Sequence, residues 1–204
     1  MTLLADVQAV HEDADLLVLQ KPAGLLCVPG RGPDKQDWLS ARAQQHWPGA
    51  LIVHRLDQAT SGLVLMARHI DAQRRLSHAF AERQVHKRYQ AVVWGLLAAQ
   101  EGAWNEINLP IAADWERRPL RVIDPAHGKP SLTRWRLLGH HPATGPSRIA
   151  PDPVTGRTPQ PRVHISAIAH PILGASLTAP APVPTLSPRL LLHSHHLPFP
   201  HPTP

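Results

Sequence analysis

The stretch HRLDQATSGLVLMAR, residues 54–68, is the most informative part of this 204-residue chain. It places one carboxylate, Asp57, between the basic residues His54 and Arg55 and the small polar turn Thr60-Ser61-Gly62, and the apolar run that follows predicts a strand over 62–67. A carboxylate at the mouth of a strand–turn–strand unit can act as a nucleophile or a general base, and a nearby guanidinium keeps it ionised. An exposed turn with an ordinary Arg–Asp pair has the same pattern, so these residues alone leave both interpretations open.

The composition limits the class of protein. The chain is long enough for one domain with a buried core. It has 21 Lys and Arg against 15 Asp and Glu, a net charge of +6, which favours a polyanion such as RNA or DNA as partner. An excess of basic over acidic residues also occurs in proteins that bind no charged partner. The single cysteine, Cys27, excludes a disulfide framework and a Cys-based zinc site. The N-terminal residues lack the pattern of a signal peptide, and no stretch approaches the ~20 apolar residues of a membrane span, so we expect a cytoplasmic protein.

Short apolar runs bounded by polar or glycine-rich stretches predict further strands. Besides 62–67, these runs cover residues 3–10, 16–19, 25–28, 51–53 and 89–97. The first two runs are joined by five polar or small residues, which is typical of a hairpin or of two adjacent strands.

Two segments between these runs predict helices. Residues 38–47 follow Asp37, which we expect to be the N-cap. Residues 71–83 are amphipathic, with one apolar face made of Ala72, Leu76, Ala79 and Phe80. Because strands and helices mix without strict alternation, we expect an α+β fold in which a mixed, mostly antiparallel sheet forms the core and helices flank it.

HRLD followed by TSG resembles the catalytic motif of the RluA family of RNA pseudouridine synthases, and KPAGLLCVPG (residues 21–30) resembles the first motif of that family, which shapes the catalytic cleft. The resemblance implies that Asp57 is the nucleophile that converts uridine in RNA to pseudouridine, without a metal or nucleotide cofactor. We expect His54, Arg55, Thr60 and Ser61 to contact the substrate, with Arg55 holding the flipped-out nucleoside.

The stretch HKRYQAVVWG, residues 86–95, carries a second candidate. Lys87 and Tyr89 lie two residues apart on a predicted strand, so their side chains share a face. A tyrosine that faces a cleft can stack on a base and exchange a proton, although a half-buried strand aromatic has the same signature. The K-x-Y pattern is similar to the second motif of the family, which implies that Tyr89 packs against the target base and assists proton removal at C5.

Residues 108–122, NLPIAADWERRPLRV, combine arginines with an aromatic residue. Trp115, Arg117 and Arg118 in such a pattern suit contacts with RNA bases and backbone, and a solvent-facing arginine-rich loop is the alternative. The D-W-x-x-R-P run resembles the branch of the family that acts on both ribosomal and transfer RNA.

Residues 155–164, TGRTPQPRVH, resemble the third motif, which implies that Arg162 pairs with Asp57 and holds it ionised. Here Pro159 and Pro161 replace a histidine and an apolar residue. Fifteen of the 23 prolines lie in residues 142–204, and the chain ends where relatives continue through a final strand. Since proline removes a sheet donor, we expect residues 142–204 of a single catalytic domain, residues 1–204, to be either loop-rich or poorly ordered, and impaired catalysis is a hypothesis beside that of an active enzyme.

A metal site formed by His193, His195 and His196 is not expected, because alternate residues of a strand face opposite ways and no carboxylate or cysteine lies nearby in the sequence. We expect a monomer that binds RNA and no membrane. A catalytically impaired RNA-binding protein of the same fold is the alternative function. A carboxylate-nucleophile hydrolase unrelated to RNA is a more remote one.

Overall fold

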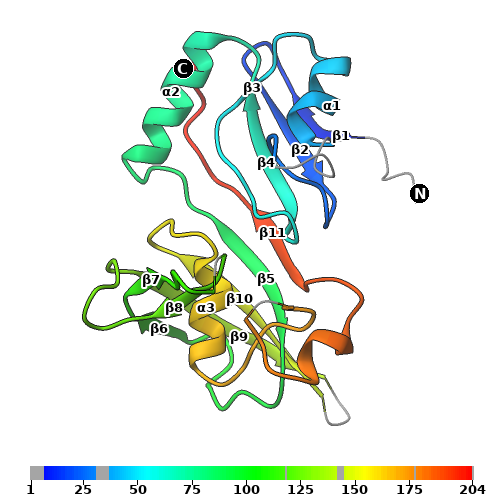
Figure 1. The fold of residues 1–204 in the computed structure, drawn as a ribbon. Coiled ribbons are helices and arrows are strands. Elements are labelled where there is room, and N and C mark those ends of the chain that lie inside the picture. The colour runs from blue at the N-terminus through cyan, green and yellow to red at the C-terminus, as the bar shows by residue number, and fades with distance from the viewer. Residues whose placement is uncertain (1–6, 31–36, 118, 142–144, 177, 204) are drawn as a thin grey trace. The chain divides into compact units, whose positions relative to one another are not determined.

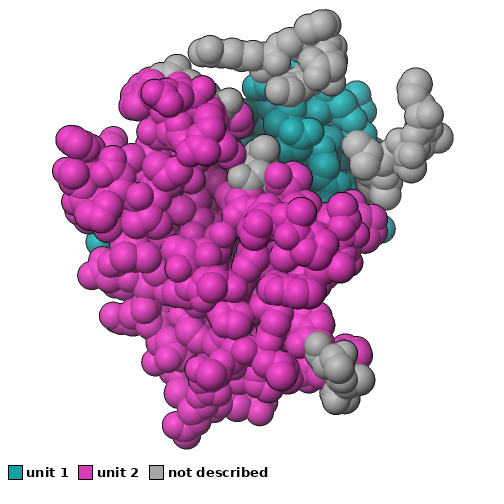
Figure 2. All heavy atoms as spheres, turned by 60° about the horizontal axis from the view of Figure 1, so that its bottom comes forward, with its two compact units in different colours: residues 1–86, 194–204 teal, residues 87–193 magenta. Residues whose placement is uncertain are grey.

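The computed structural model describes residues 7–30, 37–117, 119–141, 145–176 and 178–203. The chain forms two compact units, residues 1–86 with 194–204 (unit 1) and residues 87–193 (unit 2), which Figure 2 distinguishes by colour. The start of the predicted first strand and Arg118 lie outside the described residues. The expectation of one catalytic domain over 1–204 stays a prediction.

Unit 1 is built on an antiparallel sheet that runs β1-β2-β4, with β3 also paired to β4 and the C-terminal residues of β11 on the other side of β4 (Figure 1). The predicted strands over 16–19, 51–53 and 62–67 are confirmed. The elements of this unit are β1 (Gln8–Glu12), β2 (Leu16–Lys21), α1 (Leu39–His46), β3 (Leu51–Ile52), β4 (Ser61–Ala67), α2 (Ile70–Ala81) and the end of β11 (Leu192–His196).

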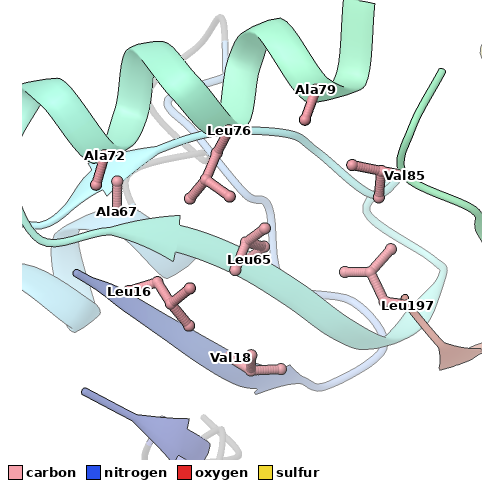
Figure 3. Packing of buried hydrophobic residues seen from close by; sticks show 9 residues of the cluster. All are labelled: Leu16, Val18, Leu65, Ala67, Ala72, Leu76, Ala79, Val85 and Leu197. Atoms are coloured by element: carbon pink, nitrogen blue, oxygen red, sulfur yellow. The ribbon is translucent and has the colours of Figure 1, made fainter. Parts of the chain in front are cut away.

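Helix α2 covers one face of this sheet with the apolar stripe that its sequence predicts. Its N-cap, His69, accepts a hydrogen bond from the Ala72 N–H, and Leu76 points from the helix toward Leu65 of β4 (Figure 3). Burial of each leucine side chain in such a core contributes roughly 1.5–3 kcal/mol. The core of unit 1 consists of Leu16, Val18, Leu65, Ala67, Ala72, Leu76, Ala79, Val85 and Leu197.

In unit 2 the strands of the nine-stranded sheet run in the order β5-β10-β9-β6, each paired antiparallel with the next, and the hairpin β7–β8 forms a separate two-stranded sheet beside helix α3 (Figure 1). The strand pairs whose register is described are all antiparallel, in agreement with the predicted α+β class. The elements of this unit are β5 (Arg88–Val93), β6 (Trp104–Asn108), β7 (Ile111–Ala113), β8 (Arg121–Ile123), β9 (Leu132–His140), β10 (Ser147–Pro153), α3 (Gln160–Ala167), the 3-10 helix η1 (Val183–Leu186) and the start of β11.

Two local predictions in unit 1 were wrong. Residues 25–28 form no strand and contribute a single bridge between Leu26 and Trp38. Asp37 does not cap α1, whose N-cap is Trp38 without a side-chain hydrogen bond. The Asp37 carboxylate accepts hydrogen bonds from the Arg42 guanidinium instead, and an exposed aspartate can take that partner without being at a helix end.

The prolines near Arg162 do not break a sheet, because their segment is the start of α3. Pro159 is the N-cap and Pro161 lies in the first turn. The first four N–H groups of a helix have no acceptor within the helix, so proline loses nothing there, and the expected loss of sheet hydrogen bonds was wrong for this segment. In β10 the register with β5 covers Ser147–Ile149, and Pro151 lies beyond it, opposite Trp135 of β9.

Within the described part of the chain, no helix has the length and apolar character needed to cross a membrane.

Candidate active site

Asp57 lies in the loop between β3 and β4 of unit 1, and its side chain is half-buried. A turn closes directly after it, in which the Thr60 N–H donates to the Asp57 carbonyl (3.1 Å). Among its neighbours, Arg55 and Gln58 are exposed and Leu56 is buried. The loop therefore holds the Asp57 carboxylate at the boundary between core and surface.

The segment that follows β2 fixes the residue on each side of Asp57. The Gly24 N–H donates to the Gln58 carbonyl (2.8 Å), and the Gln58 side-chain amide donates back to the Gly24 carbonyl (3.0 Å). On the other side, the Leu56 N–H donates to Cys27 Sγ (3.3 Å), whose thiol donates to the Leu56 carbonyl (3.4 Å). These two reciprocal pairs restrict the backbone torsions through Asp57.

Lys21 supplies a buried positive charge that is hydrogen-bonded to this loop. Its side chain is fully buried, and the ammonium donates to the carbonyls of Pro22 (2.9 Å), Leu25 (2.7 Å) and Gln58 (3.0 Å). Burial lowers the pKa of Lys21 to about 8, while the negative charge of Asp57 opposes that shift. The ammonium form thus predominates at neutral pH, uses all three donors and attracts the Asp57 carboxylate.

The other predicted residues of this loop differ in exposure. His54 is buried, its Nε2 accepts from the Leu65 N–H (3.0 Å), and its ring stacks on Phe80 with centroids 4.6 Å apart. Thr60 and Ser61 are buried too. His54 therefore ties the loop to β4 and α2, and the expected substrate contacts of all these residues stay predictions.

In unit 2, Tyr89 lies in β5 with a buried side chain, and Lys87 comes just before this strand. Burial lowers the pKa of Lys87. A methyl group added at Gly156 would lie 3.9 Å from Lys87 Nζ, so the Lys87 ammonium lies against the glycine of the TGRT segment.

Two buried polar side chains position helix α3, which carries Arg162. The Gln160 amide oxygen accepts from Thr155 Oγ1 (2.7 Å) and the Arg157 N–H (3.1 Å), and its nitrogen donates to the Leu132 carbonyl (2.8 Å) and Thr133 Oγ1 (2.9 Å). All four bonds lie within unit 2, so Gln160 joins the segment before α3 to strand β9.

His164 makes a matching attachment one turn later. Its Nε2 lies 2.9 Å from the Leu109 carbonyl, which can only accept, so Nε2 carries the proton and Nδ1 accepts from Thr133 Oγ1 (2.9 Å). Burial lowers the pKa of His164. Neither Gln160 nor His164 was predicted from the sequence as a functional residue, although their i, i+4 spacing is the signal that they share a helix face.

At the hairpin β7–β8, Trp115 is 72% exposed. The Arg117 guanidinium binds the Asp114 carboxylate through Nε (2.8 Å) and Nη2 (2.7 Å), and the Arg117 N–H also donates to it (3.0 Å). These backbone and side-chain hydrogen bonds lower the pKa of Asp114. Arg117 is thus engaged within the hairpin.

The structure brings Asp57, Lys21 and His54 together in unit 1, and it places Lys87, Tyr89 and Arg162 in unit 2. The pairing of Asp57 with Arg162 stays a prediction.

A family model described as RNA pseudouridylate synthase matches residues 15–167. The dual-specificity RNA pseudouridine synthase RluA of Pasteurella multocida is 44% identical over 193 residues, which cover 95% of this chain and 86% of that protein. The enzyme of the same description from Escherichia coli K12 is 39% identical over 193 residues, with the same coverage.

Two solved structures are also similar. Human RNA Pseudouridylate Synthase Domain Containing 1 matches with a TM-score of 0.82 and 30% identity, over 97% of this chain and 80% of that one. Human RNA Pseudouridylate Synthase Domain Containing 4 matches with a TM-score of 0.72 over 94% of this chain and 84% of that one, and at 22% identity this match shows the fold alone.

Proposed function

Since the chain belongs to the RluA family of RNA pseudouridine synthases, we propose that it isomerises specific uridines in stem-loops of ribosomal RNA, transfer RNA or both. The isomerase activity on uridine in RNA comes with the family. The dual choice of RNA is supported by the name of relatives that align over 95% of the chain, dual-specificity RNA pseudouridine synthase. We further propose that the protein acts as a cytoplasmic monomer.

In this proposal Asp57 is the nucleophile that attacks the flipped-out uridine, at C6 of the base or at C1′ of the ribose. The bond between N1 and C1′ breaks, the uracil turns, and C5 bonds to C1′. The bond between Asp57 and the substrate breaks in the same sequence, which restores the free carboxylate. The proton lost from C5 is balanced by the proton gained at N1, so the reaction is an isomerisation. Tyr89 assists proton removal at C5, and Arg162 holds the Asp57 carboxylate ionised.

One observation carries this assignment: the residue on each side of Asp57 is held by a reciprocal pair of hydrogen bonds, and the buried ammonium of Lys21 donates to the Gln58 carbonyl next to it. A covalent nucleophile must be ionised and aimed before substrate arrives, because reorganisation during the reaction would raise the barrier. An ordinary surface turn needs no such attachment.

The test maps pseudouridine by chemical labelling in RNA from cells with and without the gene, and in cells that carry Asp57→Asn. We expect specific positions to lose the modification in the deletion and in the variant. Purified Asp57→Asn should still bind the mapped stem-loop, with an affinity that falls as salt rises. If the wild-type chain binds this RNA but forms no product, the alternative of an RNA-binding protein without catalysis replaces the proposal.

A further inference from the structure

Unit 2 contains a cavity of about 710 Å³ beside the hairpin β7–β8. We propose that it holds a second nucleotide of the substrate RNA, one other than the target uridine, with its base against Trp115 and its phosphate among Arg121, Lys129 and Arg157. This inference rests on the proposed function, because it names a specificity site for the same RNA. A volume of this size suits a small organic ligand, for which sites of ~300–1,000 Å³ are usual.

The charge of the cavity selects an anionic ligand. Arg121, Lys129 and Arg157 are exposed, and within the described part of the chain none of them has a carboxylate within 4.0 Å. The acidic group in the lining is Asp124, whose Oδ1 accepts from the Ala126 and His127 N–H groups (3.0 Å each). The three cations are therefore available to a phosphate group.

Trp115 supplies the flat apolar surface that a base requires. Its indole is 72% exposed, and it lines both this cavity and a neighbouring one of about 400 Å³ with Pro119 and Leu120. Bases stack on such aromatic side chains whatever their sequence, while cations beside the ring hold the backbone. An aromatic ring and cations in one lining favour a nucleotide over an acidic peptide, which offers charge without a ring.

The cationic side chains rise from backbone that is already fixed. Arg121 lies directly opposite Ala113 in the hairpin, so the two side chains share a face. On the other side of β7, Ile111 and Lys129 exchange backbone hydrogen bonds (3.0 and 2.9 Å). A methyl group at Gly128 would overlap the carbonyl of Asp124, which shows how closely the turn before Lys129 packs. Little backbone ordering is therefore required when the ligand binds.

Within unit 2, the cavity is linked to the helix that carries a predicted catalytic residue. Arg157 belongs to the TGRT segment that leads into α3, and its N–H is held by the Gln160 side chain. The same helix carries Arg162. A nucleotide in the cavity would thus be held by the segment that also positions a predicted catalytic residue.

The first experiment is an abasic scan. Each loop nucleotide of the mapped stem-loop, except the target uridine, is replaced in turn by an abasic one, and binding and conversion are measured with wild-type protein and Trp115→Ala. We expect one abasic position to weaken wild-type binding roughly 5- to 150-fold, the factor that corresponds to ~1–3 kcal/mol of stacking. Trp115→Ala should bind the intact RNA more weakly by the same factor. The abasic nucleotide at that position should then cause no further loss of affinity.

The control is Trp104→Ala, an exposed tryptophan on β6 that stacks with Arg136 and does not line the cavity. It should respond to the abasic scan as wild type does. Trp115→Ala with wild-type affinity, or with an equal loss at every abasic position, would overturn the proposal. Conversion of the intact RNA by wild type is measured in parallel, so a failure of the proposed function appears separately as absence of product.

The second experiment tests the phosphate contact. Arg121→Gln should reduce the slope of log affinity against log salt by about 0.7, the value for one phosphate contact with single-stranded RNA. Arg148→Gln, an exposed arginine on β10 outside the cavity lining, should leave that slope unchanged. Equal slopes for both variants would contradict the phosphate assignment.

Discussion

Replacement of Lys21 by methionine should strongly destabilise unit 1, although the two side chains are similar in size. Three hydrogen bonds from a charged donor contribute roughly 5–9 kcal/mol together. The desolvation that lowers the pKa of Lys21 from 10.5 to about 8 offsets roughly 3 kcal/mol of this. We therefore expect Lys21→Met to lower the free energy of unfolding by about 2–6 kcal/mol, a large share of the ~5–15 kcal/mol that stabilises a typical domain.

Thermal unfolding measures this effect. A loss of that size corresponds to a fall in melting temperature of at least about 4 °C. Lys129→Met, the same substitution at an exposed site, should change the melting temperature by no more than ~2 °C, because surface changes usually stay within ~0.5 kcal/mol. Well below the melting temperature, Lys21→Met should also have a lower kcat, since the Gln58 carbonyl beside Asp57 loses its donor.

The pH dependence gives a second readout. Because the folded state releases the Lys21 proton near pH 8 and the unfolded state near 10.5, the unfolded state binds more protons between these values. The stability of wild type relative to Lys21→Met should therefore increase as the pH rises from about 8 to 10.5. A melting temperature of Lys21→Met equal to that of Lys129→Met, with no such pH trend, would refute the reasoning.

Three further predictions follow from single contacts. Gly62→Ala should prevent unit 1 from folding, as judged by circular dichroism, because the added Cβ would overlap the backbone of Ser194 and the φ of +117° disfavours any side chain; a folded variant with native stability would contradict this. Gln160→Leu should lower the free energy of unfolding by about 3 kcal/mol and increase hydrogen exchange over residues 155–167, since four buried hydrogen-bond partners lose Gln160, and unchanged exchange would disprove its role. In an NMR titration His201 should have a pKa above 6.5, because Thr203 and the Asp13 carboxylate favour the imidazolium, and Asp13→Asn should lower it; its stabilising effect is full below pH 6.5 and is lost as the pH rises through the raised pKa.

Local sequence patterns were enough to predict the framework of unit 1. Short continuous apolar runs identified β2 and β4, and the i, i+4, i+7 spacing of Ala72, Leu76 and Ala79 identified the buried face of α2. Both signals depend on residues close together in the chain, and a buried face leaves little freedom for another arrangement.

The hydrogen bonds that hold the Asp57 loop could not be predicted from the sequence. Lys21 and Gln58 are 37 residues apart, and Cys27 and Leu56 are 29 apart. These contacts depend on how β2 pairs with β4. They also use backbone carbonyls, and because every residue has one, the sequence does not show which carbonyl becomes an acceptor.

The effect of the prolines was misjudged for a different reason. A proline in the middle of a strand removes a hydrogen bond, whereas at the start of a helix it removes nothing, so the consequence depends on which element forms. The short segment 155–167 has too few apolar residues for its sequence pattern to distinguish a strand from a helix. Once the segment is known to form α3, Pro159 and Pro161 lie where proline is tolerated.

The central claim is that the carboxylate of Asp57 performs the chemistry on RNA. The most direct measurement incubates the purified wild-type chain and Asp57→Asn with the mapped stem-loop and quantifies pseudouridine at the target position. The account predicts stoichiometric conversion by wild type and none by Asp57→Asn, although both bind the RNA with similar affinity. Pseudouridine formed by Asp57→Asn at the wild-type rate would contradict it.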